Sequence, residues 1–301
     1  MKRAIISGAT GAVGTALIQK LIQEGTEVLV LSRKDSKRLS VLPQHESVQV
    51  KYCSLEEMAT LENDTGKEYD VFYHLAWGGT FGPSRNDMYL QNRNVQYALD
   101  AVGLAKRFGC HTFLGAGSQA EYGRTDAVMS EDTPTFPETG YGIAKLCAGQ
   151  MTRMVAHELG MKHIWVRILS IFGENDGAGS MISTTIEKLL NHERPVFTAG
   201  TQMWDYLYSG DAANALYLLG EKGRDGRIYV IGSGESIPLK EYISRLRDVV
   251  APGAELGFGE YVTAAAPLSI RADIEPLKQD VGFAPQVSFE EGIRRILASR
   301  T

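Results

Sequence analysis

A tyrosine and a lysine stand four residues apart in the segment Tyr141-Gly142-Ile143-Ala144-Lys145. On a helix this spacing places both side chains on one face, one turn apart. A free phenol has a pKa of about 10 and is a poor acid–base catalyst at neutral pH, but a nearby ammonium favours the phenolate and lowers that pKa. Ser118, at the end of a strand-like segment, could hydrogen-bond the same oxygen. These three residues predict a proton relay.

Three glycines near the N-terminus have the spacing of a phosphate-binding turn. Gly8, Gly11 and Gly14 directly follow a strand-like segment, residues 3–7, and precede a helix whose apolar face holds Leu17, Leu21 and Ile22. Glycine permits the tight turn and the close approach of a phosphate, while the helix N-terminus supplies unpaired N–H groups and a partial positive charge. The common fingerprint is Gly-x-Gly-x-x-Gly, but the position directly after the first strand favours dinucleotide binding.

The elements around these motifs alternate between strand and helix. Strand patterns occupy residues 27–31, 48–52, 69–75 and 112–117, and residues 86–108 have helical periodicity. This alternation predicts an α/β fold with a parallel sheet covered on both faces. His74, at the end of the fourth strand, is expected to be a packing residue because it has no obvious acidic partner.

The C-terminal half is mixed. We expect a helix from residue 179 to about 191, a helix that Asp211 caps or begins and that runs to Leu219, a strand at 229–231 and a closing helix at 288–299. Gly232-Ser233-Gly234 is expected to be a simple turn. Ser236 has the position of a helix N-cap, with Pro238 in the first turn.

Composition excludes several classes of protein. The net charge of −5 over 301 residues argues against nucleic acid or an anionic membrane as the main partner, and no apolar run is long enough to span a bilayer. No signal peptide is expected, since the first strand begins almost at Met1. Cys53, Cys110 and Cys147 have no paired spacing, which favours reduced thiols and a cytoplasmic location, and no His/Cys cluster suggests a metal site.

The end of the second strand bears on the choice of dinucleotide. An acidic residue there binds the ribose 2′-hydroxyl of NAD, whereas an arginine accommodates the 2′-phosphate of NADP. This strand ends in Ser32-Arg33-Lys34, and the first acid is Asp35. The sequence therefore predicts NADP, bound by Arg33 and Lys34, with NAD as the alternative.

Taken together, the motifs resemble those of extended short-chain dehydrogenases/reductases, in the nucleotide-sugar epimerase/dehydratase group. The likeness spans essentially the whole chain and is specific for the fold and the hydride chemistry, less so for the substrate. The matching positions are Gly8, Gly11, Gly14, His74-Leu75-Ala76, Asn92, Ser118, Tyr122-Gly123, Tyr141, Lys145, Arg167, Phe172-Gly173, Asp205-Tyr206, Asp211, Asp273 and Gly282-Phe283-Ala284-Pro285.

The resemblance implies a doubly wound Rossmann domain for NAD(P), residues 1–173 and 204–228, interleaved with a smaller substrate-binding lobe, residues 174–203 and 229–301. Tyr141 would be the acid–base, Lys145 would anchor the nicotinamide ribose and Ser118 would position the substrate oxygen. Asn92 would be structural or hold the triad through water. Helices 86–108 and 141–159 would form a homodimer interface. Further expected cofactor contacts are Gly8, Thr10, Gly11, Ala12, Val13, Gly14, Leu75 and Ala76.

Several positions depart from the family pattern. The related 4,6-dehydratases carry Asp-Glu directly after the triad hydroxyl residue, whereas this chain has Gln119-Ala120, which disfavours dehydration. Glu121 comes one place too late and is expected to cap or orient the loop. The residues expected at the substrate are Ser118, Gln119, Ser170 in place of an asparagine, Trp204 in place of an arginine, and Arg271 as a diphosphate ligand.

The leading interpretation is an NADPH-dependent reductase of a 4-keto-6-deoxy sugar carried on a nucleoside diphosphate. Arg33 in place of an acidic selector and the missing Asp-Glu pair favour it. The first alternative is a nucleotide-sugar epimerase that keeps a bound NAD. The second is a dinucleotide-binding regulator without turnover, which ranks last because Tyr141 and Lys145 are both present.

Overall fold

A seven-stranded sheet forms the centre of the computed structural model, which describes residues 1–177, 179–263 and 268–300. All its strands are parallel, in the order β11-β6-β5-β4-β1-β2-β3. This is a doubly wound Rossmann sheet, as the sequence predicts, and the strand order reverses at β1. The strands are β1 (Arg3–Ser7), β2 (Glu27–Ser32), β3 (Val48–Tyr52), β4 (Val71–His74), β5 (Thr112–Ser118), β6 (Lys162–Ile168) and β11 (Ile228–Ile231).

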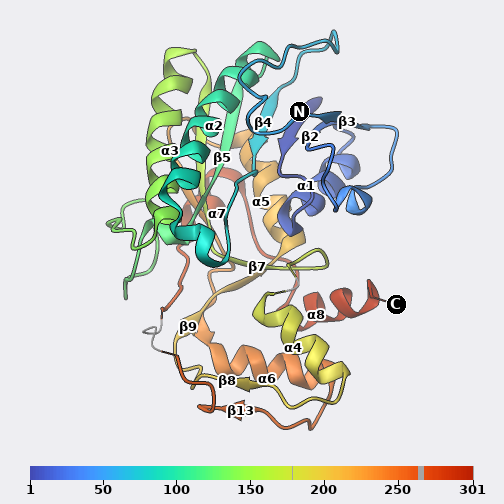
Figure 1. The fold of residues 1–301 in the computed structure, drawn as a ribbon, viewed down its shortest axis with the longest axis vertical. Coiled ribbons are helices and arrows are strands. Elements are labelled where there is room, and N and C mark those ends of the chain that lie inside the picture. The colour runs from blue at the N-terminus through green and yellow to red at the C-terminus, as the bar shows by residue number, and fades with distance from the viewer. Residues whose placement is uncertain (178, 264–267, 301) are drawn as a thin grey trace.

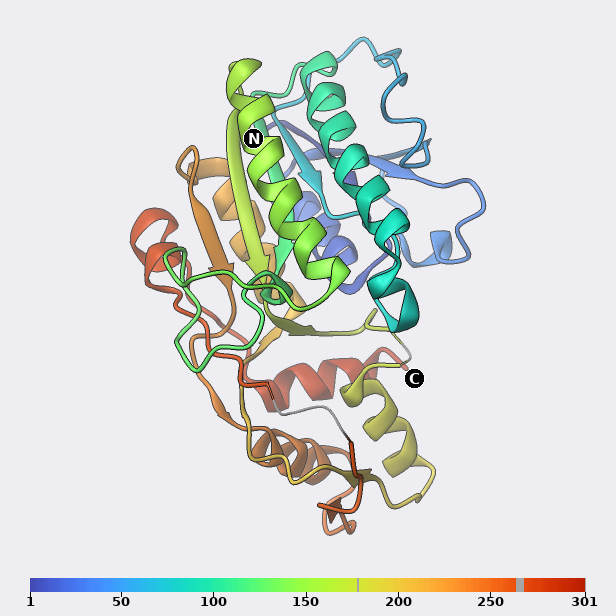
Figure 2. The same ribbon diagram turned by 60° about the vertical axis from the view of Figure 1, so that its left-hand side comes forward.

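Alternate side chains of the strands feed two separate hydrophobic layers. In β1, Ile5 packs into the layer under α2 (Met88–Arg107) and α3 (Gly140–Glu158). Its neighbours Ala4 and Ile6 pack on the opposite face, against α1 (Ala12–Gln23) and α5 (Ser209–Lys222). This two-residue period is what a strand covered on both faces requires. Figures 1 and 2 show α2 and α3 side by side on one face of the sheet.

A second, smaller core lies below the carboxyl ends of the strands (Figures 1 and 2). It is rich in aromatic rings, with Phe289 4.8 Å from Tyr242 and 5.0 Å from Phe172 between ring centroids. Its elements are β7 (Ser170–Phe172), α4 (Met181–Leu190), β10 (Tyr206–Tyr208), α6 (Leu239–Val250) and α8 (Phe289–Ala298), with the short strands β8 (Val196–Phe197), β9 (Met203–Trp204), β12 (Ile237–Pro238) and β13 (Gly257–Phe258).

The expected division after residue 228 needs correction. β11 is the edge strand of the large sheet and pairs with β6 over its whole length. The last part of the chain also returns to this domain, because α7 (Glu275–Val281) packs on α5 and β11, and Leu277 and Phe283 join the core of the large domain. Residues 228–231 and 270–283 therefore belong with the Rossmann domain, where Tyr229 and Ile231 are fully buried.

Three further expectations can be compared with the structure. His74 is buried and shares a 2.9 Å hydrogen bond with the Ser7 hydroxyl, and burial lowers its pKa to about 3, which confirms a packing role. The Ser236 cap is wrong, because α6 begins at Leu239 after Pro238 and has no side-chain cap. Asp211 is no cap either, since its carboxylate lies within α5 and accepts from the backbone of Gln286 and Val287.

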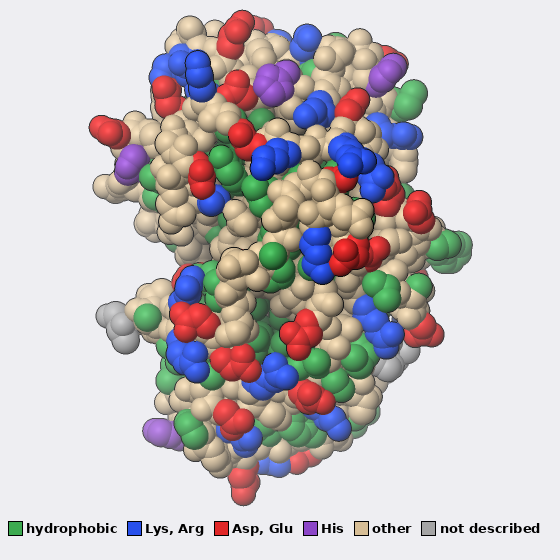
Figure 3. Space-filling view, turned by 180° about the vertical axis from the view of Figure 1, so that it is seen from behind, with side chains coloured by type: hydrophobic (Ala, Val, Ile, Leu, Met, Phe, Trp, Pro, Cys, Tyr) green, Lys and Arg blue, Asp and Glu red, His purple; other side chains and the backbone are tan. Residues whose placement is uncertain are grey.

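The surface mixes charges of both signs. Figure 3 shows acidic and basic side chains interspersed over the rear face. No helix among the described residues is long and apolar enough to cross a membrane. Short 3₁₀ turns complete the fold at η1 (Leu39–Val41), η2 (Gly82–Asn86) and η3 (Gln119–Glu121), and the latter two lie next to α3.

Candidate active site

Two cavities lie at the carboxyl ends of the central strands, where doubly wound sheets bind their ligands. One, of about 570 Å³, is lined by the ends of β1 and β2 and by α2. The other, of about 540 Å³, is lined by the N-terminus of α1, the end of β5, the start of α3 and the smaller lobe. Gly8 and Trp77 line both. We call the first the adenosine-side cavity because it contains Arg33, which the sequence predicts to contact the adenosine ribose, and the second the catalytic cavity because it contains Ser118, Tyr141 and Lys145.

The glycine turn between the cavities is shaped by two different constraints. Gly8 has φ +78°, and a methyl group on it would lie 2.5 Å from the backbone nitrogen of Ala76. A methyl group on Gly14 would lie 2.5 Å from the Gly8 carbonyl oxygen. A methyl group on Gly11 would meet only that same oxygen, at 3.8 Å, although Gly11 lines the catalytic cavity. Protein packing therefore explains two of the glycines, whereas Gly11 leaves space for a ligand.

The N-terminus of α1 fits a dinucleotide phosphate. Gly11 is its N-cap residue and provides no side-chain cap, so the first N–H groups of the helix lack a side-chain acceptor among the residues that the structure describes. Ala12, Val13 and Gly14 line the catalytic cavity at this point, and Leu75 lies across from them. Thr10 and Ala76 line the adenosine-side cavity. The predicted glycine-turn residues thus line the two cavities beside the N-terminus of α1, where a phosphate could bind.

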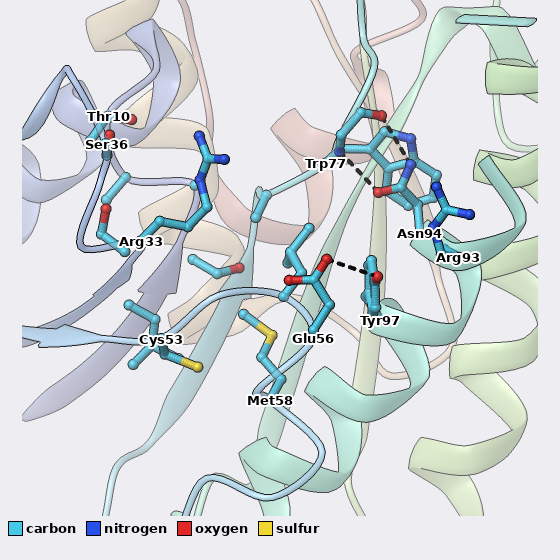
Figure 4. Close-up of a pocket in the computed structure, with 18 of the residues that line it drawn as sticks. Thr10, Arg33, Ser36, Cys53, Glu56, Met58, Trp77, Arg93, Asn94 and Tyr97 are labelled. Carbon is cyan, nitrogen blue, oxygen red and sulfur yellow. Dashed lines mark hydrogen bonds between the residues drawn. The ribbon is translucent and has the colours of Figure 1, made fainter. Parts of the chain in front are cut away.

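The adenosine-side cavity is open and carries two arginines. Arg33, which follows β2, and Arg93 of α2 both line it, and Figure 4 shows them on opposite sides of the view. The Arg33 side chain is 66% exposed, and its ion pair with Asp35 spans 3.9 Å. Glu56 also lines the cavity and accepts a hydrogen bond from Tyr97. Lys34 is exposed and is absent from the residues described around either cavity.

The asparagine expected near the cofactor is Asn94 rather than Asn92. Asn92 is exposed on α2 and lines neither described cavity. Asn94 is buried, lines the adenosine-side cavity, and exchanges two 2.9 Å hydrogen bonds with the N–H and carbonyl of Gly78. The helical period carries this signal, because Asn94 shares its face with Ala98 and Ala101, whereas Asn92 falls on the opposite, solvent-facing side.

Ser118 is held by a buried charge network. The Glu121 carboxylate accepts from the Ser118 backbone N–H at 2.8 Å and from the Arg167 Nε at 2.8 Å, and it also binds the Trp165 indole. Glu121 and Arg167 are almost entirely buried. The Ser118 hydroxyl accepts from the Ala120 N–H, which completes a capping box. The expected loop-orienting role of Glu121 is confirmed.

Two glycines allow close contacts around the Ser118 loop, one with α3 and one with the Glu121 carboxylate. A methyl group on Gly142 would lie 2.2 Å from the carbonyl oxygen of Ala120. A methyl group on Gly117 would lie 2.3 Å from the Glu121 carboxylate. Only glycine fits at these two contacts, and Ser118 and Tyr141 both line the catalytic cavity.

Lys145 is buried beneath Trp77. Its Nζ donates to the Ala116 carbonyl at 2.5 Å and lies 3.8 Å from the centre of the Trp77 ring system. Burial lowers the pKa of Lys145 to about 7, although Glu121 opposes this shift. Trp77 also packs edge-on against Tyr141, with ring centroids 6.2 Å apart, and its indole N–H donates to Gln91.

The environment of Tyr141 differs from the one expected. Burial raises the pKa of its phenol, and the groups that oppose burial are the hydrogen bond with Ser118 and the positive charge of Arg85. The Lys145 ammonium lies 5.8 Å from the Tyr141 ring centroid, whereas the Arg85 guanidinium carbon lies 4.5 Å from it. The sequence argument from the Tyr141–Lys145 spacing therefore missed the cation that lies nearest to this ring.

The smaller lobe closes the catalytic cavity. Gln119 and Ser170 line it as expected, and so does Trp204, whose buried indole N–H has no hydrogen-bond partner among the described residues. Asp176 also lines it, and burial raises the pKa of its carboxyl. Arg271 is half-buried and is absent from the residues described around the cavity, so its diphosphate role stays a prediction.

Comparison with known proteins identifies the family of the chain. The sequence matches the family described as the NAD dependent epimerase/dehydratase family over residues 4–232, which is more than half of the chain. The chain belongs to this family. Membership confirms the resemblance to extended short-chain dehydrogenases/reductases and makes the chain an NAD(P)-dependent enzyme.

The relatives within the NAD dependent epimerase/dehydratase family catalyse different reactions. The dTDP-4-dehydro-6-deoxyglucose reductase of Escherichia coli is 26% identical over 98% of this chain and 96% of its own. An uncharacterized UDP-glucose epimerase of Bacillus subtilis is 24% identical over 98% of this chain and 96% of its own. A Bacillus cereus UDP-glucuronic acid 4-epimerase, solved with UDP-glucuronic acid and NAD, has 20% identity and a TM-score of 0.84, covering 99% of this chain and 98% of that one.

Sequence analysis did not identify four residues that line the two cavities of this protein. Trp77 and Arg85 follow the His74-Leu75-Ala76 motif, in a loop whose course cannot be derived from periodicity. Arg93 and Asn94 lie on α2, where the buried face identifies Asn94. The described residues contain no group of three or more His, Cys, Asp or Glu side chains that could hold a metal ion.

Proposed function

We propose that this enzyme reduces a 4-keto-6-deoxy sugar carried on a nucleoside diphosphate, with NADPH as the reductant. The observation that carries the proposal is the composition of the catalytic cavity. It contains the phenol of Tyr141, the hydroxyl of Ser118 and the amine of Lys145. The two positions after Ser118, Gln119 and Ala120, supply no carboxyl for a second proton transfer, and the Asp176 carboxyl in the cavity comes from a different segment, in the smaller lobe. Such a site suits carbonyl reduction better than elimination of water. The reductase among the relatives supports the same assignment.

We assign the residue roles from the family resemblance and from which of these residues line the two cavities. The glycine turn and the N-terminus of α1 would hold the dinucleotide phosphates, and Lys145 would hold the nicotinamide ribose with the N–H groups that Ala116 leaves free. When bound, the nicotinamide supplies a hydride to the carbonyl carbon of the sugar. Tyr141 donates its proton to the oxygen as negative charge develops there, and Ser118 hydrogen-bonds the same oxygen. Trp204 and Ser170 would contact the nucleotide sugar from the smaller lobe.

The choice of NADPH depends on Arg33. It lines the adenosine-side cavity in the position expected for a 2′-phosphate ligand, and Arg93 adds a second positive charge to that cavity. The solved relative that contains NAD supports the opposite choice. A nucleotide-sugar epimerase with a retained NAD is therefore the second candidate, and the Bacillus subtilis relative favours it.

The first measurement is to denature freshly purified protein and identify the released dinucleotide by chromatography. We expect little retained cofactor, and NADPH oxidation when a nucleoside-diphosphate 4-keto-6-deoxyhexose is added. Near-stoichiometric NAD with no keto-sugar reduction would instead establish the epimerase cycle, because that cycle regenerates its cofactor in place.

Replacement of Tyr141 by Phe tests the proton donor. We expect kcat to fall by roughly 10² to 10⁴ because the developing alkoxide loses its acid. The dissociation constant for NADPH should change little, since we assign the phenol oxygen of Tyr141 to the substrate carbonyl rather than to the dinucleotide. Retention of most activity by this variant would refute the assigned role of Tyr141.

We also propose a homodimer formed through α2 and α3. Ile143, Met151 and Met154 of α3 are 44–58% exposed although they are apolar, which supports burial against a second copy. The molar mass by light scattering should be twice that of the 33.0 kDa chain.

A further inference from the structure

Arg85 lies on the catalytic tyrosine without belonging to any motif. It is part of η2, and its guanidinium carbon is 4.5 Å from the centre of the Tyr141 ring. Its Nη1 donates to the Thr80 carbonyl at 3.0 Å, and the side chain lines the catalytic cavity. At this distance a guanidinium over an aromatic face is an attractive cation–π contact.

The backbone fixes this contact. A methyl group on Gly140 would lie 2.8 Å from the Met88 sulfur and 3.1 Å from the Arg85 carbonyl oxygen, so glycine allows the start of α3 to touch η2. The Asn86 side chain accepts a 3.0 Å hydrogen bond from the Gly140 N–H. This hydrogen bond joins the residue directly after Arg85 to the residue directly before Tyr141, and so it holds the two backbone segments together.

Some of the other groups around the Tyr141 phenol favour its ionised form, and others disfavour it. Ser118, from the end of β5, hydrogen-bonds it, while Glu121 of η3 adds negative charge that disfavours the phenolate. Lys145, on the same helix, is 5.8 Å from the ring centroid, is bonded to Ala116, and loses much of its charge near pH 7 because of burial. Trp77 contributes only an uncharged ring edge. Arg85 is the cation nearest to the Tyr141 ring among these groups.

We propose that Arg85 is a positioning residue of this active site: its guanidinium holds the Tyr141 ring in place and favours the anionic form of the phenol. This rests on the acid–base role of Tyr141 in the proposed function. The balance of the step is simple, because the proton that leaves the phenol oxygen passes to the substrate oxygen in reduction and returns from it in oxidation. Arg85 itself neither gains nor loses a proton.

The proposal predicts opposite effects on the two directions of the reaction. Reduction needs the protonated phenol, whereas oxidation of the alcohol needs the phenolate. Loss of the Arg85 charge raises the pKa of Tyr141, so alcohol oxidation at neutral pH slows, and the basic limb of the reduction profile moves to higher pH. A purely structural defect would lower both rates and leave the limb in place.

The decisive experiment does not depend on turnover. Protein labelled with ¹³C at the tyrosine ζ carbon is titrated between pH 7 and 10.5, and the Tyr141 resonance is assigned by its absence in Tyr141→Phe. In Arg85→Gln we expect the phenolate-to-phenol ratio of Tyr141 to fall about tenfold at each pH, which equals a pKa shift of about one unit. Arg85→Lys, which retains a positive charge, should recover part of the shift.

Arg124→Gln is the matched control. Arg124 is an exposed arginine on the neighbouring loop, where it pairs with Glu138, and its removal should leave the Tyr141 titration unchanged. An unchanged titration in folded Arg85→Gln, or an equal shift in Arg124→Gln, would overturn the proposal. Because the resonance reports on the ligand-free protein, this outcome is distinct from failure of the proposed reductase activity, which would appear only in the assay with keto-sugar.

Discussion

The two ends of the ligand cleft are built on different physical terms. At the catalytic end, Lys145 and Glu121 are at most 3% exposed, and their neighbours approach so closely that only glycine fits at 117 and 142. At the adenosine end, the Arg33 side chain is 66% exposed and its ion pair with Asp35 spans 3.9 Å. Packing thus fixes the groups that we propose to perform chemistry, while the group expected to select the dinucleotide relies on a solvated contact that is worth less.

This contrast can be tested first through the pH dependence of stability that a lysine at each end contributes. Lys145 has its pKa lowered to about 7 by burial, so the folded state disfavours its charged form. Between about pH 7 and the ordinary lysine pKa of about 10.4, the unfolded chain binds more protons at this residue, and stability rises with pH. The free energy of unfolding of the wild type relative to Lys145→Met should therefore increase by about 1.4 kcal/mol per pH unit over that range.

Urea denaturation at pH 6, 7, 8 and 9 measures this difference. Exposed Lys34 at the adenosine end provides the control, and Lys34→Met should differ from the wild type by an amount that does not vary with pH. A flat difference for Lys145→Met, or an equal slope for Lys34→Met, would show that the two ends do not differ as described.

A smaller effect is expected from adding one methyl group at each of two glycines. In Gly142→Ala the methyl group would lie 2.2 Å from a backbone oxygen that cannot rotate away, which should destabilise the fold by about 1–3 kcal/mol. In Gly11→Ala the nearest protein atom is 3.8 Å away, so stability should be nearly unchanged while dinucleotide affinity falls. Thermal unfolding and calorimetric titration measure the two properties. Equal destabilisation of both variants would contradict the assignment of Gly11 to ligand binding.

The smallest predicted effect concerns cofactor selectivity. Arg33→Ala should weaken NADPH binding by about tenfold, the loss of one partly solvated phosphate contact, and leave NADH nearly unchanged. Lys34→Ala should alter neither, because Lys34 lines neither described cavity. Fluorescence titration with both dinucleotides at one fixed ionic strength gives the comparison. An equal loss for NADPH and NADH would remove the selectivity role from Arg33.

Local sequence patterns were sufficient for much of this site. The glycine turn, the strand ends and the Tyr141–Lys145 pair depend on short-range spacing, and the structure brings Gly8, Ser118, Tyr141 and Lys145 to the same edge of the sheet. Helical periodicity places Asn94 on the buried face of α2, but a motif match assigned the role of the asparagine near the cofactor to Asn92 instead. The boundary at residue 228 failed because β11 is short and joins the sheet only by pairing with β6, a contact between segments distant in sequence.

By itself the sequence determined the parallel sheet, the order of its elements and the candidate for the proton-transfer group, because strand alternation, glycine spacing and a one-turn helical pair are properties of neighbouring residues. Only the tertiary structure decided which charges act on that group. Arg85 and Tyr141 are separated by 55 intervening residues and meet because Gly140 lets two elements touch. The pKa of Lys145 likewise depends on the dry space beneath Trp77. Electrostatics in a buried site depends on distance and desolvation in three dimensions, and neither can be derived from spacing along the chain.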